Sequence, residues 1–161
     1  ENMRDLGTPV HSINFFKSMY KIFSNKINFI HVFLDDKPIA SALYISFKNT
    51  IEVPFASSIK NYRPLCPNNM LYWELIKLGC IQGKEQFIFG RSTWDSGTFK
   101  FKKQWGASPI SLNYQYFSSD NQNEPIQDSK KRTYDFSRKL WSKLPKKIAN
   151  SIGPHIIKNI P

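Results

Sequence analysis

The sequence predicts an α/β (α+β) domain in which a mixed, mostly antiparallel sheet is flanked by helices and followed by a basic helical tail. Residues 27–34, 39–47 and 50–56 are rich in β-branched and aromatic side chains and are joined by short polar turns, a pattern typical of an antiparallel meander. A helical repeat of apolar residues before a fourth such stretch indicates a crossover, and therefore one parallel pair of strands. The 161 residues, 40% of them hydrophobic, suffice for a buried core.

Helix signals lie on both sides of the meander. Ser12 is a good N-cap before apolar residues at helical spacing, which predicts a helix over residues 12–23. A second helix is expected to open at Asn68 and Asn69 and to end near Gly83, a plausible C-cap. Beyond it we expect a strand over residues 86–89, a polar loop over 90–97, a short helix over 98–104 and a last strand over 109–117.

The C-terminal part differs in composition from the rest. Residues 118–129 are a linker by composition, which divides the chain into a domain over 1–117 and a basic, amphipathic helical tail over 130–161. The formal net charge is +11, and residues 129–161 hold nine Lys or Arg against one acid, which leaves only +3 for residues 1–128. Pro145 interrupts the helical pattern of the tail, and Gly153-Pro154 is expected to end it.

Several classes of protein are disfavoured by what the sequence contains. Two cysteines are too few for a disulfide scaffold and lack metal-ligand spacing, and the apolar runs are too short to cross a bilayer. No signal peptide opens the sequence, so a cytoplasmic protein is expected. The chain does not begin with Met, and we expect it to be part of a longer protein with a further N-terminal half.

One candidate site is the turn before the second long helix. The start of a helix presents free backbone N–H groups, which suit a phosphate or carboxylate, and Arg63 would add a fork of donors beside Asn68 and Asn69. The alternative is that Asn68 is only an N-cap and Arg63 only a surface charge.

A second candidate site follows the strand over residues 86–89, at the end of a sheet where open α/β folds place ligands. Arg91 and Ser92 precede the short helix that carries Phe101 and Lys102, and this mixture suits an anionic substrate. A lysine held over a polarised carbonyl can stabilise a developing oxyanion. The alternative is a solvated loop followed by an ordinary amphipathic turn.

These segments resemble FemAB-like proteins, in particular those associated with the exosortase/PEP-CTERM system. The resemblance runs along nearly the whole chain and corresponds to the second of two N-acetyltransferase-like (GNAT-like) halves. It is carried by Gly90-Arg91-Ser92 with Phe101-Lys102-Lys103-Gln104-Trp105-Gly106, by Pro67-Asn68-Asn69-Met70-Leu71-Tyr72-Trp73-Glu74, by Glu52-Val53-Pro54-Phe55-Ala56-Ser57-Ser58, and by the chain ends around residues 2–11 and 140–154.

The resemblance implies transfer of an acyl or aminoacyl group to an amine of a cell-envelope or exopolysaccharide precursor. The donor would be acyl-CoA or aminoacyl-tRNA, with no tightly bound cofactor. The family's Phe-Lys pair maps to Phe101 and Lys102, with Lys102 handling the donor's carbonyl or phosphate and with Arg91 and Ser92 in the pocket. The chain lacks the Arg/Gln-x-x-Gly-x-Gly pyrophosphate loop of the wider acetyltransferase pattern, which leaves the use of CoA open.

Amide formation also needs a base, for which Glu52 on the third strand is the candidate. A lone strand glutamate is otherwise an edge or solvent-facing residue. His31 is expected to be a core histidine, Cys66 to be a small, partly buried thiol rather than a nucleophile, and no hydrolase triad is recognisable.

Partners remain open at this stage. The tail over residues 130–161 could lie on an anionic membrane surface, or its apolar side could pack on the domain with its charges solvated. A tRNA donor could use the same positive charge without base readout. The domain could also be a catalytically inactive half that binds acceptor or partner, or a CoA-dependent N-acetyltransferase, and homo-oligomers are possible.

Overall fold

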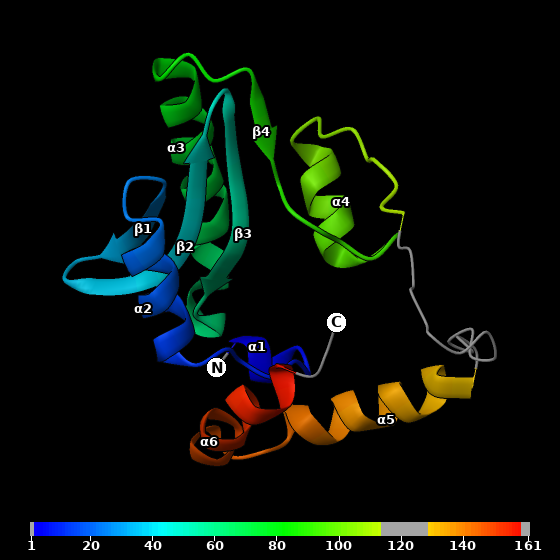
Figure 1. Cartoon of the computed structure of the whole chain (residues 1–161). Helices are drawn as coiled ribbons and strands as arrows, with labels where there is room; N and C mark the ends of the chain where they lie inside the picture. The colour runs from blue at the N-terminus through cyan, green and yellow to red at the C-terminus, as the bar shows by residue number, and fades with distance from the viewer. Residues whose placement is uncertain (1, 114–128, 159–161) are drawn as a thin grey trace.

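The computed structural model describes residues 2–113 and 129–158, and over 129–135 it describes the backbone alone. Figure 1 shows a sheet backed by one long helix, a smaller helical unit beside it, and two helices below. In chain order the elements are α1 (Asn2–Asp5), α2 (Ile13–Ile22), β1 (Ile27–Leu34), β2 (Lys37–Phe47), β3 (Thr50–Ser58), η1 (Lys60–Leu65), α3 (Pro67–Ile81), β4 (Gln86–Ile88), α4 (Gly97–Gln104), α5 (Ser129–Ser142) and α6 (Lys146–Ile157).

The sheet has the expected mixed topology, with strand order β1-β2-β3-β4. The first three strands form the antiparallel meander, and β4 pairs parallel to β3 after the crossover through α3. The predicted fold class and the parallel pair are therefore confirmed.

Helix α3 covers one face of the sheet and forms the core with it. Leu71 and Leu75 are fully buried, and with Tyr72 they pack on small strand residues, Ala40 and Ala42. Gly83 follows the helix with φ +64°, a left-handed conformation that favours glycine, and its N–H donates to the Cys80 carbonyl. The predicted end of this helix is thus confirmed.

The opposite face of the sheet meets α2 through aromatic rings. The predicted cap is present, because the Ser12 hydroxyl accepts from the Phe15 N–H at 3.1 Å. The His11 ring stacks on Phe15 at 4.5 Å between centroids and contacts Phe55 of β3 edge-on at 5.7 Å. This cluster fastens the segment before α2 to the sheet.

Burial lowers the pKa of His11 below its ordinary value. The unfolded chain therefore takes up the proton at a higher pH than the folded chain. As the pH drops through the ordinary pKa of histidine toward the lower pKa of the folded state, the free energy of unfolding decreases. We expect His11→Phe, which keeps the ring stack, to flatten the loss of melting temperature between about pH 7 and about pH 5. The control is His31→Phe at an exposed position; an unchanged pH profile in His11→Phe would contradict this role.

Two sequence predictions about the strands of this domain were wrong. Residues 109–113 form no strand, and the remainder of that expected strand lies outside the described residues. His31 is exposed rather than a core residue, because Ile30 and Val32 are the residues of β1 that pack against the core under α3.

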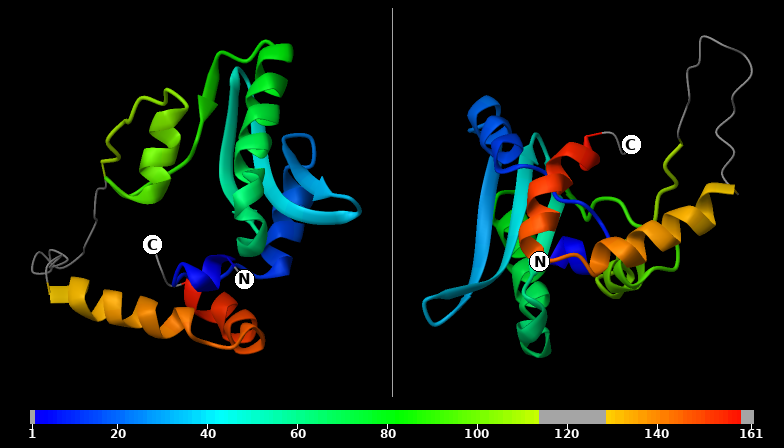
Figure 2. Two further views of the ribbon diagram at one scale, coloured as in Figure 1. Left: turned by 180° about the vertical axis from the view of Figure 1, so that it is seen from behind. Right: turned by 90° about the horizontal axis from the view of Figure 1, so that it is seen from below.

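The tail forms two helices, and Figure 2 shows α5 and α6 on the side of the domain where α1 lies. The break at Pro145 is confirmed, since this residue is the N-cap of α6. The expected end at Gly153-Pro154 was wrong, because α6 continues through Pro154 to Ile157. The expected linker lies outside the described residues except for Ser129, which begins α5.

Candidate functional site

Strand β3 continues well beyond its parallel partner. Pairing with β4 covers only Thr50 to Glu52, whereas pairing with β2 on the other side reaches Ser58. Among the described residues, no strand pairs with the other edge of β3 from Pro54 onward. Alternate N–H and C=O groups of this stretch therefore point away from β2 toward an open edge.

The point where β4 leaves β3 coincides with a register shift on the other side of β3, in its pairing with β2. The β2–β3 ladder slips between Leu43 and Ile45, opposite Pro54, a residue that strands tolerate at bulges and edges. The loop after β4 passes close to this point: a Cβ on Gly90 would lie 3.1 Å from the Val53 carbonyl oxygen, and Gly90 has φ +72°. Glycine is needed here for both reasons.

The start of α3 contains an unusual buried acceptor. The helix begins at Pro67, and its N-cap is Cys66 in the left-handed conformation (φ 52°) with no side-chain cap bond, so the expectation that Asn68 caps the helix was wrong. Asn68 Oδ1 is buried and has no hydrogen-bond partner among the described residues. Asn68 precedes Leu71 and Tyr72 by three and four residues, which places it on the helix side that faces the sheet. Buried polar atoms are nearly always bonded, so this acceptor points to a missing donor.

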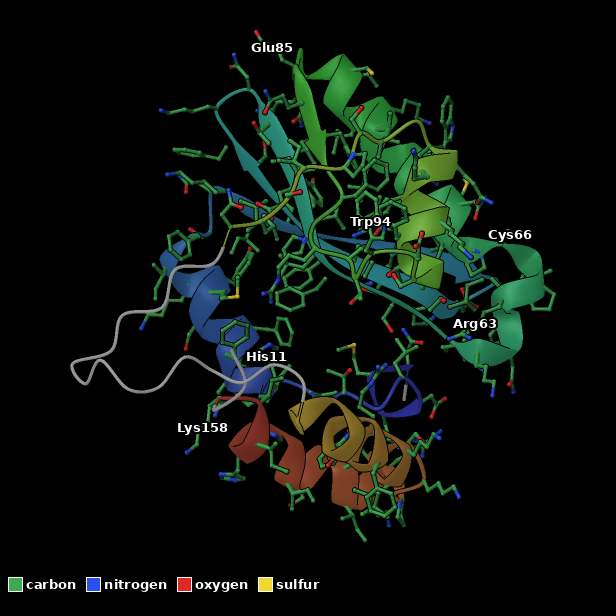
Figure 3. All side chains as sticks on the ribbon, turned by 90° about the vertical axis from the view of Figure 1, so that its right-hand side faces the viewer. His11, Arg63, Cys66, Glu85, Trp94 and Lys158 are labelled. Atoms are coloured by element: carbon green, nitrogen blue, oxygen red, sulfur yellow. The ribbon has the colours of Figure 1, made fainter. Side chains whose placement is uncertain are left out.

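The other two candidate residues of this turn, Arg63 and Asn69, lie on the surface of the protein. Asn69 is exposed, and the exposed Arg63 donates through Nη2 to Asn2 Oδ1 at 2.7 Å. Figure 3 shows Arg63 and Cys66 around the turn before α3 and Trp94 in the loop before α4. The Cys66 thiol is exposed, contrary to the expected partial burial.

Lys102 fastens α4 to the loop after β4. Its Nζ donates to the carbonyl oxygens of Gly90 at 2.9 Å and Arg91 at 2.8 Å, and burial lowers its pKa below the ordinary value. An ammonium has three donors, so these two bonds leave a third N–H. Arg91 and Ser92 are exposed in the same loop.

Phe101 packs toward the core. Its ring lies 5.3 Å from Tyr72, and Tyr72 in turn stacks on Phe89 at 5.4 Å. These three rings join α4, α3 and the end of β4 just beside the point where the strands separate. Phe101 therefore holds the site's wall in place by packing.

Glu52 lies at the closed end of the split, as the last residue of β3 that pairs with β4. It is half-buried between Ile45 and Ile88 on the neighbouring strands. Its neighbours Ile51 and Val53 are buried toward α3, so the carboxylate is on the opposite face, as the alternation of the strand predicts.

The structure thus brings most of the expected residues to one region. Lys102, Phe101, Arg91 and Ser92 share the β4–α4 unit, and Tyr72 links this unit to the helix side that carries Asn68. Sequence reasoning missed Tyr72 and the open edge of β3. The signals that could have found the edge are Pro54 within a strand and Gly90 just after the next one.

Two hollows in the described part of the chain are lined by none of the expected site residues. One of about 350 Å³ is lined by Asn2, His31 and the far end of the open edge at Ser57 and Ser58. The other, of about 310 Å³, lies between residues 5–7 and α5. The candidate site is therefore the unpaired strand edge and the residues around it.

Two features are absent from the described residues. Within residues 2–113 and 129–158, no group of three or more His, Cys, Asp or Glu could hold a metal ion. No helix in the same part of the chain is long and apolar enough to span a membrane.

The chain is similar to one known family of domains. A family profile described as an acetyltransferase (GNAT) domain matches residues 1–103, which include the meander, α3, β4 and Lys102. No curated protein matches the chain. Domains of this family transfer acyl groups and typically take acetyl-CoA as the donor, without a tightly bound cofactor. The chain belongs to the GNAT acetyltransferase domain family.

Proposed function

We propose that this domain is a FemAB-like acyl- or aminoacyltransferase that moves an acyl group from a carrier to an amine of a cell-envelope or exopolysaccharide precursor. The observation that carries the proposal is the early end of the β3–β4 pairing, which leaves the edge of β3 open from Pro54 to Ser58. An extended ligand with amide groups can pair with such an edge as an additional strand would. The pantetheine arm of CoA is a ligand of that kind.

The surrounding residues suit the rest of a donor. Asn68 Oδ1 is a buried acceptor with no partner in the described part of the chain, and it could accept from an N–H or O–H of the donor. The third N–H of Lys102 can bind the donor's carbonyl or phosphate oxygen. The first turn of α3 offers partial positive charge to phosphates, although its first residue, Pro67, has no N–H.

The proposed reaction is a single acyl transfer. The acceptor's amine nitrogen attacks the donor's carbonyl carbon, the new C–N bond forms, and the C–S bond of a thioester or the C–O bond of an aminoacyl ester breaks. Glu52 takes the proton lost by the amine, and the thiolate or alkoxide leaves with a proton from solvent. Both donor classes are made in the cytoplasm, which is where we place the reaction.

The nature of the donor can be tested by a thermal-shift titration of the protein with acetyl-CoA, CoA and bulk aminoacyl-tRNA. A ligand that binds the folded state raises the melting temperature by mass action. We expect a shift with one donor class, and strong salt dependence if that class is tRNA. If the folded protein shifts with none of them, it does not bind donor by itself.

Replacing the proposed base gives a separate prediction. Glu52→Gln should slow acyl transfer by about 100-fold or more while leaving the donor-induced thermal shift unchanged, because the carboxylate acts on the acceptor. The matched control is Glu85→Gln at an exposed position. A normal rate in Glu52→Gln would remove Glu52 from the mechanism.

The alternative function is a partner-binding half without activity of its own. It is favoured by the exposed aromatic rings of β1, since Phe29 and Phe33 retain 44% and 56% of their accessible surface. A further half of the same protein could cover this face. A folded domain that binds no donor but regains binding when joined to such a half would support this alternative.

A further inference from the structure

The two C-terminal helices direct apolar side chains away from the domain. On α5, Phe136 and Leu140 keep 70% and 58% of their accessible surface, and they are one helical turn apart on the same side. On α6, Ile148, Ile152 and Ile156 repeat at four-residue intervals and are 47%, 40% and 39% exposed. Both helices therefore carry an outward apolar stripe.

The inner sides of these helices include polar and small residues that contact the N-terminal segment closely. Arg138, on the side of α5 away from Phe136, donates to the Leu6 carbonyl at 3.0 Å, and a Cβ on Gly7 would lie 2.7 Å from the Arg138 carbonyl oxygen. On α6, Ala149 and Gly153 are buried, and a Cβ on Gly153 would lie 3.1 Å from the Val10 backbone nitrogen. Close backbone contact holds the tail, so its apolar stripes are not needed for docking.

The charge around the stripes is one-sided. Residues 129–161 hold nine Lys or Arg and one acid. Lys139 lies next to Phe136 and Leu140 around α5, Lys143 directly follows the helix, and both lysines are exposed. Exposed apolar residues flanked by cations are typical of helices that lie in the plane of a membrane surface.

We propose that α5 and α6 bind the surface of an anionic membrane, with their apolar stripes in the boundary between headgroups and acyl chains. The cations would contact lipid phosphates, each strengthening binding roughly fivefold near an anionic surface. The absence of a spanning helix in the described chain fits binding at the surface. This inference does not depend on the proposed acyl transfer, although it would bring the domain to lipid-linked acceptors.

Vesicle cosedimentation tests the proposal. The full chain should sediment with vesicles that contain phosphatidylglycerol, much less with phosphatidylcholine alone, and less at high salt. Phe136→Glu/Leu140→Glu should lower the partition coefficient by about tenfold or more. The control Ile22→Glu/Ile81→Glu changes the charge equally at residues 70% and 76% exposed on α2 and α3, and it should bind as the unchanged protein does.

A second copy of this chain is the alternative partner for the apolar stripes of α5 and α6. Sedimentation velocity without lipid separates the two, and all four positions are exposed, so both double variants should keep the melting temperature. Unchanged vesicle binding in Phe136→Glu/Leu140→Glu would overturn the proposal. The proposal would also be overturned if the unchanged protein does not bind anionic vesicles and forms a dimer that Phe136→Glu/Leu140→Glu converts to a monomer.

Discussion

Asn68→Leu should make the protein more stable and less able to bind its donor. The substitution removes a buried oxygen that has no hydrogen-bond partner within residues 2–113 and 129–158, and it puts apolar atoms of similar size in its place. We expect the free energy of unfolding to rise by about 1 kcal/mol, because an unpaired buried acceptor carries a desolvation cost. The melting temperature should rise by roughly 2–4 °C. The apparent dissociation constant of the donor should rise by about tenfold, because the acceptor is then missing from the bound state.

The neighbouring residue provides the control. Asn69→Leu makes the same chemical change at an exposed position of the same helical turn, and it should alter neither stability nor donor binding appreciably. Thermal unfolding and a donor titration of both variants measure the two effects. If Asn68→Leu destabilises the protein, or leaves donor affinity unchanged, the oxygen is not reserved for the donor.

Lys102→Met should have the largest effect on turnover. The ammonium joins α4 to the carbonyl oxygens of Gly90 and Arg91, so the variant loses both this attachment and a donor for the developing oxyanion. We expect the rate of acyl transfer to fall by about 100-fold or more. Stability should fall by roughly 1–3 kcal/mol, because two carbonyl groups lose their partner.

Two further variants separate positioning from catalysis. Lys103→Met removes a charge from the adjacent, exposed position and should leave both rate and stability near normal. Lys102→Arg keeps a cation that can bond the two carbonyl groups, so it should recover most of the stability. If Lys102→Arg also recovers the full rate, Lys102 acts only by holding the loop.

The sequence was sufficient for the fold because local signals and pairing agreed. The short turns between β1, β2 and β3 allow only antiparallel neighbours, and a helix between β3 and β4 requires a parallel pair. Ser12 and Gly83 were found because their capping chemistry is local. The segment around Lys102 was proposed from its place after β4 and its residue types, and the family resemblance favoured it over an ordinary solvated loop.

Two features could not be predicted from the sequence: how far the β3–β4 pairing extends, and how the C-terminal helices contact the N-terminal segment. The open edge exists because β4 is only three residues long, and no local pattern fixes where a parallel pair ends. The apolar periodicity of the tail left open whether its apolar side packs on the domain or faces outward. The structure docks α5 and α6 through Gly7, Ala149 and Gly153, whose lack of bulk allows backbone contact and carries no periodic hydrophobic signal.

The most direct test of the proposed donor site is amide hydrogen exchange along β3, measured with and without saturating acetyl-CoA. In the free protein, the amides among Phe55 to Ser58 that face the open edge should exchange quickly, while those of Ile51 and Glu52, which lie between two paired strands, exchange slowly. If the donor pairs with the open edge, the edge-facing amides of residues 55–58 should become protected, while the amides that are already paired should change little. A thermal shift with acetyl-CoA but no protection at residues 55–58 would show that the donor binds elsewhere, and would contradict the account.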